Sequence, residues 1–308
     1  RIKNAVFCFR KIHDLSDIEI VQLARNDNID MAVDLNGYTS ENRISIFHLR
    51  VAPIQINYLG YPGTIGSKSH DYIIADKILI PEENQKFFTE KVLYLTTSAF
   101  HYEYKQNVQV RKFTKEELGL PSDRFVFTCF NKIQKITRKE FEVWFRLLKK
   151  IDGSVLWLIK PNKTAITNII SELTNNGIEK DRIIFANKIK LEDHISRHLC
   201  GDLFLDTFNF NAATTAKIAL SSGLPVITLS GNTYSARMAA SILKEWELDE
   251  LITYSEQEYE ALAYELATNN KMLKNIREKI KLKIKGSVSD SHKFTKELER
   301  IYSKITRK

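Results

Sequence analysis

Residues 202–229 read DLFLDTFNFNAATTAKIALSSGLPVITL, and this stretch sets the fold of the chain. The short apolar run Leu203–Asp206 predicts a buried strand, and a helix is expected over Thr214–Ser222, ended by Gly223. The run Pro225–Leu229 predicts the next strand. Strand, helix and strand in this order indicate a parallel α/β sheet, because parallel strands need a long crossover connection that is usually helical.

The same alternation continues on both sides of this stretch and gives five consecutive β-α units. Further strands are expected over Phe125–Phe130, Val155–Ile159 and Arg182–Ala186. Further helices are expected at about Thr137–Lys150, up to Asn175, over Glu192–Leu199 and over Tyr234–Lys244. Thr137 and Glu140 form the pattern of a capping box at the start of the first of these helices. Because the strands are continuous apolar runs, we expect both faces of the sheet to be buried.

The first third of the chain predicts a second α/β region. A helix is expected over Asp17–Asn26, and strands over Met31–Leu35, Ile54–Leu59, Asp71–Ala75 and Lys91–Leu95. The polar stretch Val108–Ser122 is poor in aliphatic residues and marks the expected boundary. We therefore predict Rossmann-like domains over residues 1–112 and 113–290, and a closing helix over 291–308. Two such domains suggest a cleft between them, with ligand at the carboxyl ends of the strands.

The charge of the chain is basic, with 46 Lys and Arg against 38 Asp and Glu and a net charge of +8. Much of the excess lies between Lys271 and Lys285, where Leu273, Ile276 and Ile280 recur at helical spacing. A solvated helix with one packed face is favoured over a nucleic-acid patch, because no zinc-finger or RNP-like motif accompanies the basic run. Nucleic acid is therefore not an expected partner.

Membrane and secretion signals are not expected features of this sequence. No apolar run approaches the roughly 18 residues of a membrane span, and residues 1–21 mix charged with apolar residues throughout. The cysteines, Cys8, Cys129 and Cys200, are odd in number and widely spaced. A disulfide framework or zinc-thiolate site is therefore disfavoured, and the cytoplasm is the expected compartment.

Two loops after predicted strands have the composition of a phosphate site. The first is Phe130–Lys135, in which Lys132 and Lys135 lie three apart beside a helix start. An ordinary solvated loop explains these lysines equally well. The second is Asn211–Thr215, where small residues allow close approach and two threonines lie at the positive end of a helix. The alternative there is that Thr214 only caps the helix.

Other candidate motifs are weaker. The stretch Leu59–Thr64, LGYPGT, is by itself an ordinary turn. Although His194 and His198 share a helix face, the pattern is not HExxH and has no evident third ligand, so no metal site is expected. The chain has no Walker loop, no GxSxG and no GxGxxG, which argues against nucleotide hydrolysis, esterase chemistry and standard dinucleotide oxidoreduction.

A series of blocks, in order, resembles one family. They are Asp34–Thr39, Arg50–Gln55, Leu59–Thr64, Asp71–Asp76, Ser154–Leu158, Asp181–Phe185, Asp202–Thr207 and Ser235–Ser241. The family is that of the O-linked N-acetylglucosamine transferases with their SPINDLY-like relatives. The resemblance extends from about Ile29 to Tyr302, and it is specific because LGYPGT and the later blocks occur together.

The resemblance implies a GT-B fold and an inverting transfer, without metal or cofactor, from UDP-N-acetylglucosamine to Ser or Thr hydroxyls of a protein acceptor. It implies that Lys135 meets the donor diphosphate as the catalytic residue, and that the loop Leu59–Thr64 (Leu59, Gly60, Tyr61, Pro62, Gly63, Thr64) faces the sugar and acceptor. The other donor-binding positions it implies are Asn131, Lys132, Gln134, His194, Asn211, Ala213, Thr214 and Thr215.

The sequence also departs from the family pattern. Ala213 stands where the family has His, Ile218 where it has a carboxylate suited to the ribose, and Gln134 where it has Tyr. A buried ribose hydroxyl without a partner costs roughly 1–3 kcal/mol. The family's opening strand and its upstream tetratricopeptide repeats have no counterpart in the sequence, so an incomplete N-terminal domain is expected. Two alternatives therefore remain: a degenerate homologue that binds a nucleotide or a protein, and a transferase with another donor such as GDP-fucose.

Overall fold

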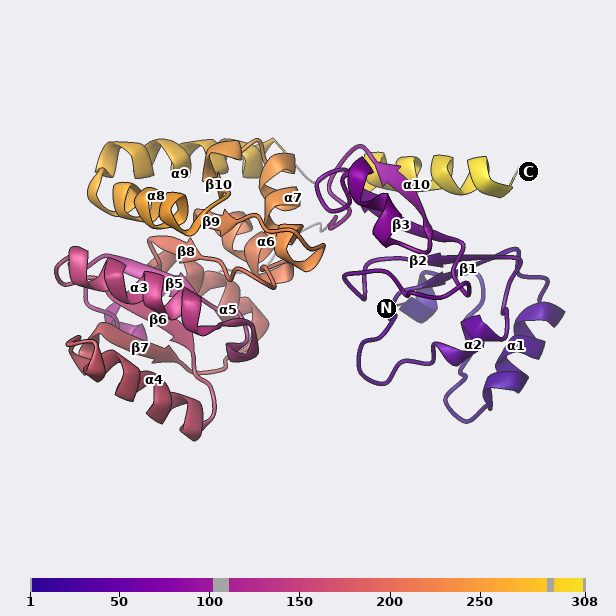
Figure 1. Cartoon of the computed structure of the whole chain (residues 1–308), viewed down its shortest axis with the longest axis horizontal. Helices are drawn as coiled ribbons and strands as arrows, with labels where there is room; N and C mark the ends of the chain where they lie inside the picture. Colours follow the sequence, from indigo (N-terminus) through magenta and orange to yellow (C-terminus); the bar gives the residue numbers. More distant parts are fainter. Residues whose placement is uncertain (1, 102–110, 287–290, 307–308) are drawn as a thin grey trace. The chain divides into compact units, whose positions relative to one another are not determined.

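The computed structural model describes residues 2–101, 111–286 and 291–306 of the chain. Its contacts divide the chain into two compact units, Arg1–Ala99 with Lys296–Lys308, and Phe100–Thr295 (Figure 1). Each unit is built on a parallel sheet, which confirms the predicted class of two α/β domains. The predicted boundary at residues 112 and 113 differs from this division, in part because Phe100 contacts Tyr234 in the second unit.

The first unit has a four-stranded parallel sheet in which spatial order follows chain order, β1-β2-β3-β4. The strands are β1 Met31–Asp34, β2 Ile54–Asn57, β3 Tyr72–Asp76 and β4 Lys91–Leu95. Its helices are α1 Asp17–Asn26 and the short α2 Ser45–His48, with 3-10 turns at Ile2–Asn4 and Glu82–Phe87. Val21, Phe47 and Val51 form a buried cluster where α1 and α2 meet.

The last helix, α10 Ser291–Thr306, contributes most of its length to the first unit. The Glu297 carboxylate accepts a hydrogen bond from the Thr96 backbone N–H, at 2.6 Å. This contact joins residues 201 positions apart in the sequence. The predicted closing helix therefore exists, and it is counted from Lys296 onward with the first unit.

The second unit has a six-stranded parallel sheet in the order β10-β9-β8-β5-β6-β7. The strands are β5 Val126–Cys129, β6 Val155–Ile159, β7 Ile183–Ala186, β8 Leu203–Leu205, β9 Val226–Leu229 and β10 Ile252–Thr253. The chain runs outward from β5 through β6 to β7, and then returns to β8 on the other side of β5. The carboxyl ends of β5 and β8 therefore flank the point where the strand order reverses, which is where such sheets bind ligands.

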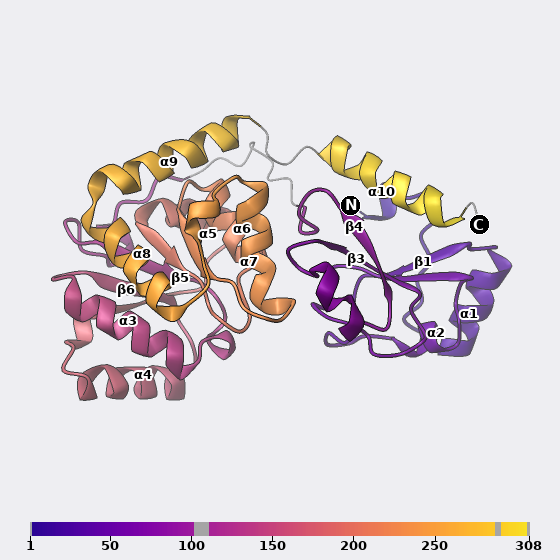
Figure 2. The same cartoon turned by 45° about the horizontal axis from the view of Figure 1, so that its top comes forward.

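Helices cover this sheet (Figure 2). They are α3 Arg138–Lys150, α4 Lys163–Asn175, α5 Leu191–Arg197, α6 Thr214–Ser221, α7 Met238–Glu245, α8 Glu256–Thr268 and α9 Asn270–Lys285. The capping box of Thr137 and Glu140 at the start of α3 is confirmed. Figures 1 and 2 both show α8 beside α3, and Glu260 on α8 accepts a hydrogen bond from Arg146 on α3 at 2.7 Å.

The basic helix α9 has the packed face predicted from its sequence. Leu273, Ile276 and Ile280 are buried. Several of its cations are paired with acids, including Arg277 with Asp202 at 3.0 Å and Lys283 with Glu247 at 2.5 Å. Among the described helices, none combines the length and the apolar character that crossing a bilayer demands.

Candidate phosphate-binding site

The structure brings together the two loops that the sequence singled out. The loop after β5 contains a 3-10 turn, Ile133–Lys135, and the loop after β8 leads into α6. Lys135 Nζ donates a hydrogen bond to the Asn211 carbonyl oxygen at 3.0 Å. Thr215 Oγ1 on α6 donates to Asn131 Oδ1 at 2.7 Å. Both bonds cross the point where the strand order reverses.

Lys135 is a half-buried cation at this point. Its Nζ lies 4.0 Å from the centre of the Phe210 ring, which is cation–π geometry. Burial lowers the pKa of Lys135, while the nearby Asp206 charge opposes this shift. The ammonium is thus held by a protein carbonyl and an aromatic face, with the charge of the buried Asp206 carboxylate nearby, and an incoming anion would have to compete with these partners.

Asn131 uses its side-chain amide inside the protein. The side chain is 3% exposed. Its Nδ2 donates to Asp206 Oδ1 at 3.1 Å and to Thr207 Oγ1 at 2.9 Å, and its Oδ1 accepts from Thr215. These contacts indicate that Asn131 fixes the two loops to each other. Direct donor binding by this residue remains a prediction.

The N-terminus of α6 differs from the capped helix that we considered as an alternative. Ala213 occupies the N-cap position, with φ −110° and ψ −81°, and no side chain caps the helix. Thr214 is the first helical residue and is exposed, while Thr215 is partly buried. The interpretation of Thr214 as the cap is therefore wrong. An N-terminus without a side-chain cap leaves its first N–H groups for solvent or for an anion.

The remaining predicted positions in these loops are spread between surface and core. Lys132 and Gln134 are exposed, and the charge of Lys132 contributes to the lowered pKa of Lys135. Asn211 is fully buried, and its Nδ2 donates to the Thr207 carbonyl oxygen at 2.6 Å. Ile218 is 5% exposed, so the apolar replacement noted in the sequence lies inside the protein.

Basic side chains of α5 and of the 3-10 turn that follows it, His198–Cys200, lie beside the loop after β5. His194 and His198 both contact the Phe130 ring. Burial lowers the pKa of His194 to about 4, with Arg197 adding to the effect. His194 Nδ1 lies 2.6 Å from the Arg197 guanidinium, so it accepts a hydrogen bond instead of facing a metal. No group of three metal-ligating side chains occurs among the described residues.

Arg197 is a residue that sequence reasoning missed. It is 2% exposed, stacks on Phe130 and Trp157, and donates to the Asn187 carbonyl oxygen at 2.7 Å. Its Nε has no hydrogen-bond partner in the described part of the chain. A buried guanidinium bonded only to a carbonyl and an imidazole is unusual, because buried charges are normally paired with opposite charge. An arginine in a helix sequence gives no signal of such burial.

The LGYPGT loop, Leu59–Thr64, lies in the first unit at the carboxyl end of β2. Leu59 has φ +71°, an uncommon conformation for a bulky residue. A Cβ at Gly60 would lie 2.0 Å from the Leu35 carbonyl oxygen, so only glycine fits there. The buried Glu90 carboxylate accepts from Ile65 N–H at 2.7 Å and from the Thr64 hydroxyl, which holds the end of the loop. That this loop faces the sugar and acceptor stays a prediction.

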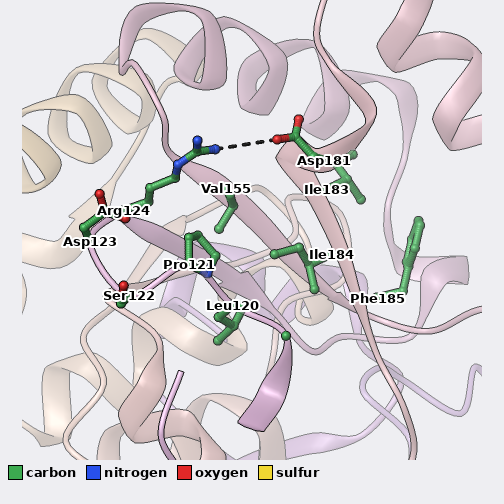
Figure 3. A pocket seen from close by; sticks show the side chains of 11 residues that line it. Leu120, Pro121, Ser122, Asp123, Arg124, Val155, Asp181, Ile183, Ile184 and Phe185 are labelled. Atoms are coloured by element: carbon green, nitrogen blue, oxygen red, sulfur yellow. Dashed lines mark ion pairs between the residues drawn. The ribbon is translucent and has the colours of Figure 1, made fainter. Parts of the chain in front are cut away.

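An open hollow of about 680 Å³ lies elsewhere in the second unit (Figure 3). It is lined by Leu120, Pro121, Val155, Ile184 and Phe185, among others, and Arg124 pairs with Asp181 at its edge at 3.7 Å. Val155 and Ile183 begin their strands, so the hollow lies at the amino ends of β6 and β7. Ligands of parallel sheets bind at the opposite, carboxyl ends.

Solved structures show the same fold. An O-GlcNAc transferase from Thermobaculum terrenum, in a mutant form, matches 99% of this chain and 58% of its own with a TM-score of 0.90 and 26% identity. A sucrose-phosphate synthase from Thermosynechococcus elongatus matches 96% of this chain with a TM-score of 0.58 and 10% identity, which shows the fold alone. The fold and the loops at the switch point thus define a protein of the two-domain glycosyltransferase class.

The family follows from the sequence comparison. The model of glycosyl transferase family 41 matches residues 10–112 and 103–298, so the chain belongs to this family. A probable UDP-N-acetylglucosamine–peptide N-acetylglucosaminyltransferase, SEC, from Arabidopsis thaliana is 31% identical over 99% of this chain and 32% of its own length. A SPINDLY protein of the same description from Hordeum vulgare is 31% identical over 96% of this chain and 31% of its own. The chain therefore spans about a third of these relatives.

Proposed function

We propose that the chain is part of a glycosyltransferase that moves N-acetylglucosamine from UDP-N-acetylglucosamine to hydroxyls of a protein acceptor, with inversion at the sugar. The observation that carries the proposal is the meeting of Lys135 with the uncapped N-terminus of α6 at the switch point. The names of the relatives supply the donor and the peptide acceptor. Cytoplasmic location is part of the proposal and agrees with three free cysteines.

The chemistry of the reaction explains why these groups suit it. The bond to the sugar breaks as the nucleotide diphosphate leaves, and negative charge grows on the phosphate oxygens. A fixed ammonium and helix-end N–H groups stabilise that charge in the transition state without moving a proton. Lys135 and the first turn of α6 would supply this stabilisation, so the proposed transfer needs no metal ion.

Calorimetric titration with UDP, without added metal and with GDP as the control nucleotide, tests the donor site. We expect UDP to bind, and Lys135→Ala to weaken binding roughly tenfold, the low end for one charge-assisted hydrogen bond, because the lysine gives up its bond to the Asn211 carbonyl oxygen when it turns to the phosphate. Lys132→Ala is the matched control, since Lys132 is an exposed lysine of the same loop. Equal effects of the two substitutions would contradict the assignment of Lys135. Preferential binding of GDP would favour the other donor class.

A second candidate function is favoured by two positions of this sequence. Ala213 and the buried Ile218 replace a histidine and a carboxylate of the family pattern. A degenerate homologue that binds a nucleotide or a protein without transfer would fit these replacements. Incubation of the full-length protein with UDP-N-acetylglucosamine and a cell extract separates the two candidates, because only a transferase labels protein hydroxyls. The anomeric configuration of the product then tests inversion.

A further inference from the structure

We propose that Asp206 is a positioning residue of the donor site, whose buried carboxylate fixes the phosphate-facing loops and supplies the negative charge that balances the Lys135 ammonium. This inference rests on the proposed function, because the loops concerned are those assigned to the donor diphosphate. Asp206 directly follows β8, at the switch point of the sheet.

The carboxylate gathers hydrogen bonds from three parts of the second unit. Its Oδ1 accepts from the backbone N–H groups of Thr207, at 2.8 Å, and Ala212, at 2.6 Å. The same oxygen accepts from Asn131 Nδ2 in the loop after β5, at 3.1 Å. Its Oδ2 accepts from the Thr228 hydroxyl on β9, at 2.7 Å. The segment from Thr207 to Ala212 therefore curls around one side chain.

This arrangement determines which groups surround the Lys135 ammonium. The curled segment presents the Asn211 carbonyl oxygen that accepts from Lys135 Nζ, and the Phe210 ring beneath the ammonium. It also ends directly before the N-cap of α6 at Ala213. The two elements assigned to the diphosphate, the lysine and the helix N-terminus, are thus both placed by contacts that converge on Asp206.

Hydrogen bonding alone does not explain why this residue is an acid. An asparagine would offer one oxygen to the three N–H donors and an amide N–H to the Thr228 hydroxyl, which also accepts. Asp206 is fully buried, and burial raises the pKa of Asp206 to about 7, so an ionised carboxylate here is costly. Because an amide could meet the same hydrogen-bond partners, the property that distinguishes the acid here is the negative charge that it carries above about pH 7.

Lys135 is the cation that this charge serves. Burial lowers the pKa of Lys135, and the charge of Asp206 is the largest influence in the opposite direction. Other titratable groups near the pair are Cys129 on β5, Glu140 on α3, Tyr259 on α8 and Lys132 in the loop. Without the carboxylate, the lysine would lose its proton at lower pH and with it the attraction for a phosphate.

Two measurements test the proposal with Asp206→Asn, which keeps the shape and most of the hydrogen bonds. Glu140→Gln is the matched control. Glu140 is also fully buried, and it also holds the same segment, by accepting from Phe208 N–H at 2.7 Å. Its charge is not among the influences on the pKa of Lys135.

The first measurement needs no donor. Lys135 acylation by a trace of acetic anhydride, followed by mass spectrometry across pH 6–11, reports the pH at which the amine loses its proton. We expect the midpoint to move to lower pH in Asp206→Asn and to stay unchanged in Glu140→Gln. An unchanged midpoint in Asp206→Asn would overturn the proposal, whether or not the protein binds UDP.

The second measurement is UDP affinity against pH. Because Asp206 itself takes up a proton near pH 7, the wild-type protein and Asp206→Asn should bind UDP about equally near pH 6. At pH 8.5 the variant should bind UDP more weakly than the wild-type protein, because without the Asp206 charge a larger fraction of its Lys135 side chains has lost the proton. A ratio that is constant across pH indicates a purely structural role and contradicts the proposal. Failure of the wild-type protein to bind UDP contradicts the proposed function instead.

Discussion

Lowering the pH from 7 to 5 should destabilise the second unit through His198. The ring is fully buried, and its Nδ1 donates to the His194 carbonyl oxygen at 2.7 Å. The other nitrogen, Nε2, has no hydrogen-bond partner in the described structure. Protonation would therefore place a charged N–H in the core with no acceptor. This burial, together with the neighbouring His194 and Arg197, lowers the pKa of His198 to about 3.

The sign and size of the effect follow from proton linkage. Below pH 6.5 the unfolded chain binds a proton at His198 that the folded chain does not, so stability falls as the pH falls from about 6.5 toward 3. At pH 5 the unfolded histidine lies 1.5 pH units below its ordinary pKa of 6.5, which corresponds to about 2 kcal/mol. At pH 7 the contribution is close to zero.

Urea unfolding followed by tryptophan fluorescence measures this effect for the second unit alone, because Trp144, Trp157 and Trp246 all lie there. The variant His198→Asn keeps a donor near the position of Nδ1 and cannot titrate. We expect the free-energy difference between wild type and variant to shrink by about 2 kcal/mol from pH 7 to pH 5.

Subtracting the unfolding free energy of His198→Asn from that of the wild type cancels the contributions of the other titrating groups. Among these is Asp206, whose raised pKa works in the opposite direction, since its stabilising protonation is present at low pH and lost as the pH rises through about 7. A loss of stability from the cavity that His198→Asn leaves adds the same amount at every pH, so it does not alter the expected change between pH 7 and pH 5. If the difference between the two proteins is the same at pH 7 and pH 5, the interpretation of His198 as a buried neutral ring is wrong.

Three further predictions concern positions outside the phosphate loops or beside them. Gly60→Ala should displace the LGYPGT loop and abolish transfer, because the new Cβ would lie 2.0 Å from a backbone carbonyl oxygen. Gly66→Ala is the comparison: its Cβ would meet open space, and only its positive φ should cost about 1 kcal/mol of unfolding free energy. Arg197→Met should raise the pKa of His194, measured by NMR titration, because Arg197 helps to lower it; an unchanged pKa argues against the contact. Glu260→Gln should lower stability by about 1 kcal/mol or less, and less at high salt, because its cationic partners are about half exposed.

The sequence predicts most of the second unit because its strands are continuous apolar runs with clear helix signals between them. Thr137 and Glu140 fix the start of α3, and Gly223 ends the segment after α6, both by local chemistry. The strand β10, Ile252–Thr253, was missed because a strand of two residues is too short to show a hydrophobic periodicity. That α10 from Lys296 onward is grouped with the first unit is not readable from sequence, because the grouping depends on contacts such as that of Thr96 with Glu297, which join distant parts of the chain.

The candidate site was predicted at the level of loops and not of individual roles. Position after a parallel strand is readable from sequence, and this singled out the segments of Lys135 and Asn211, which the structure joins by a hydrogen bond. Burial of single polar residues is not readable, because it depends on all the elements around them. Arg197, Asp206 and the inward use of the Asn131 amide therefore emerge only from the fold.

The internal partners of Lys135 limit what a phosphate can gain there. In the structure the ammonium already donates to the Asn211 carbonyl oxygen and lies over the Phe210 ring. A diphosphate must therefore replace a protein acceptor instead of water alone, so only the difference between a charged and a neutral acceptor contributes to affinity. The carbonyl of Asn211 would have to find another donor when the lysine turns to the ligand. The segment from Thr207 to Ala212 then has to stay in place without the lysine, and its bonds to the buried Asp206 carboxylate are what can hold it.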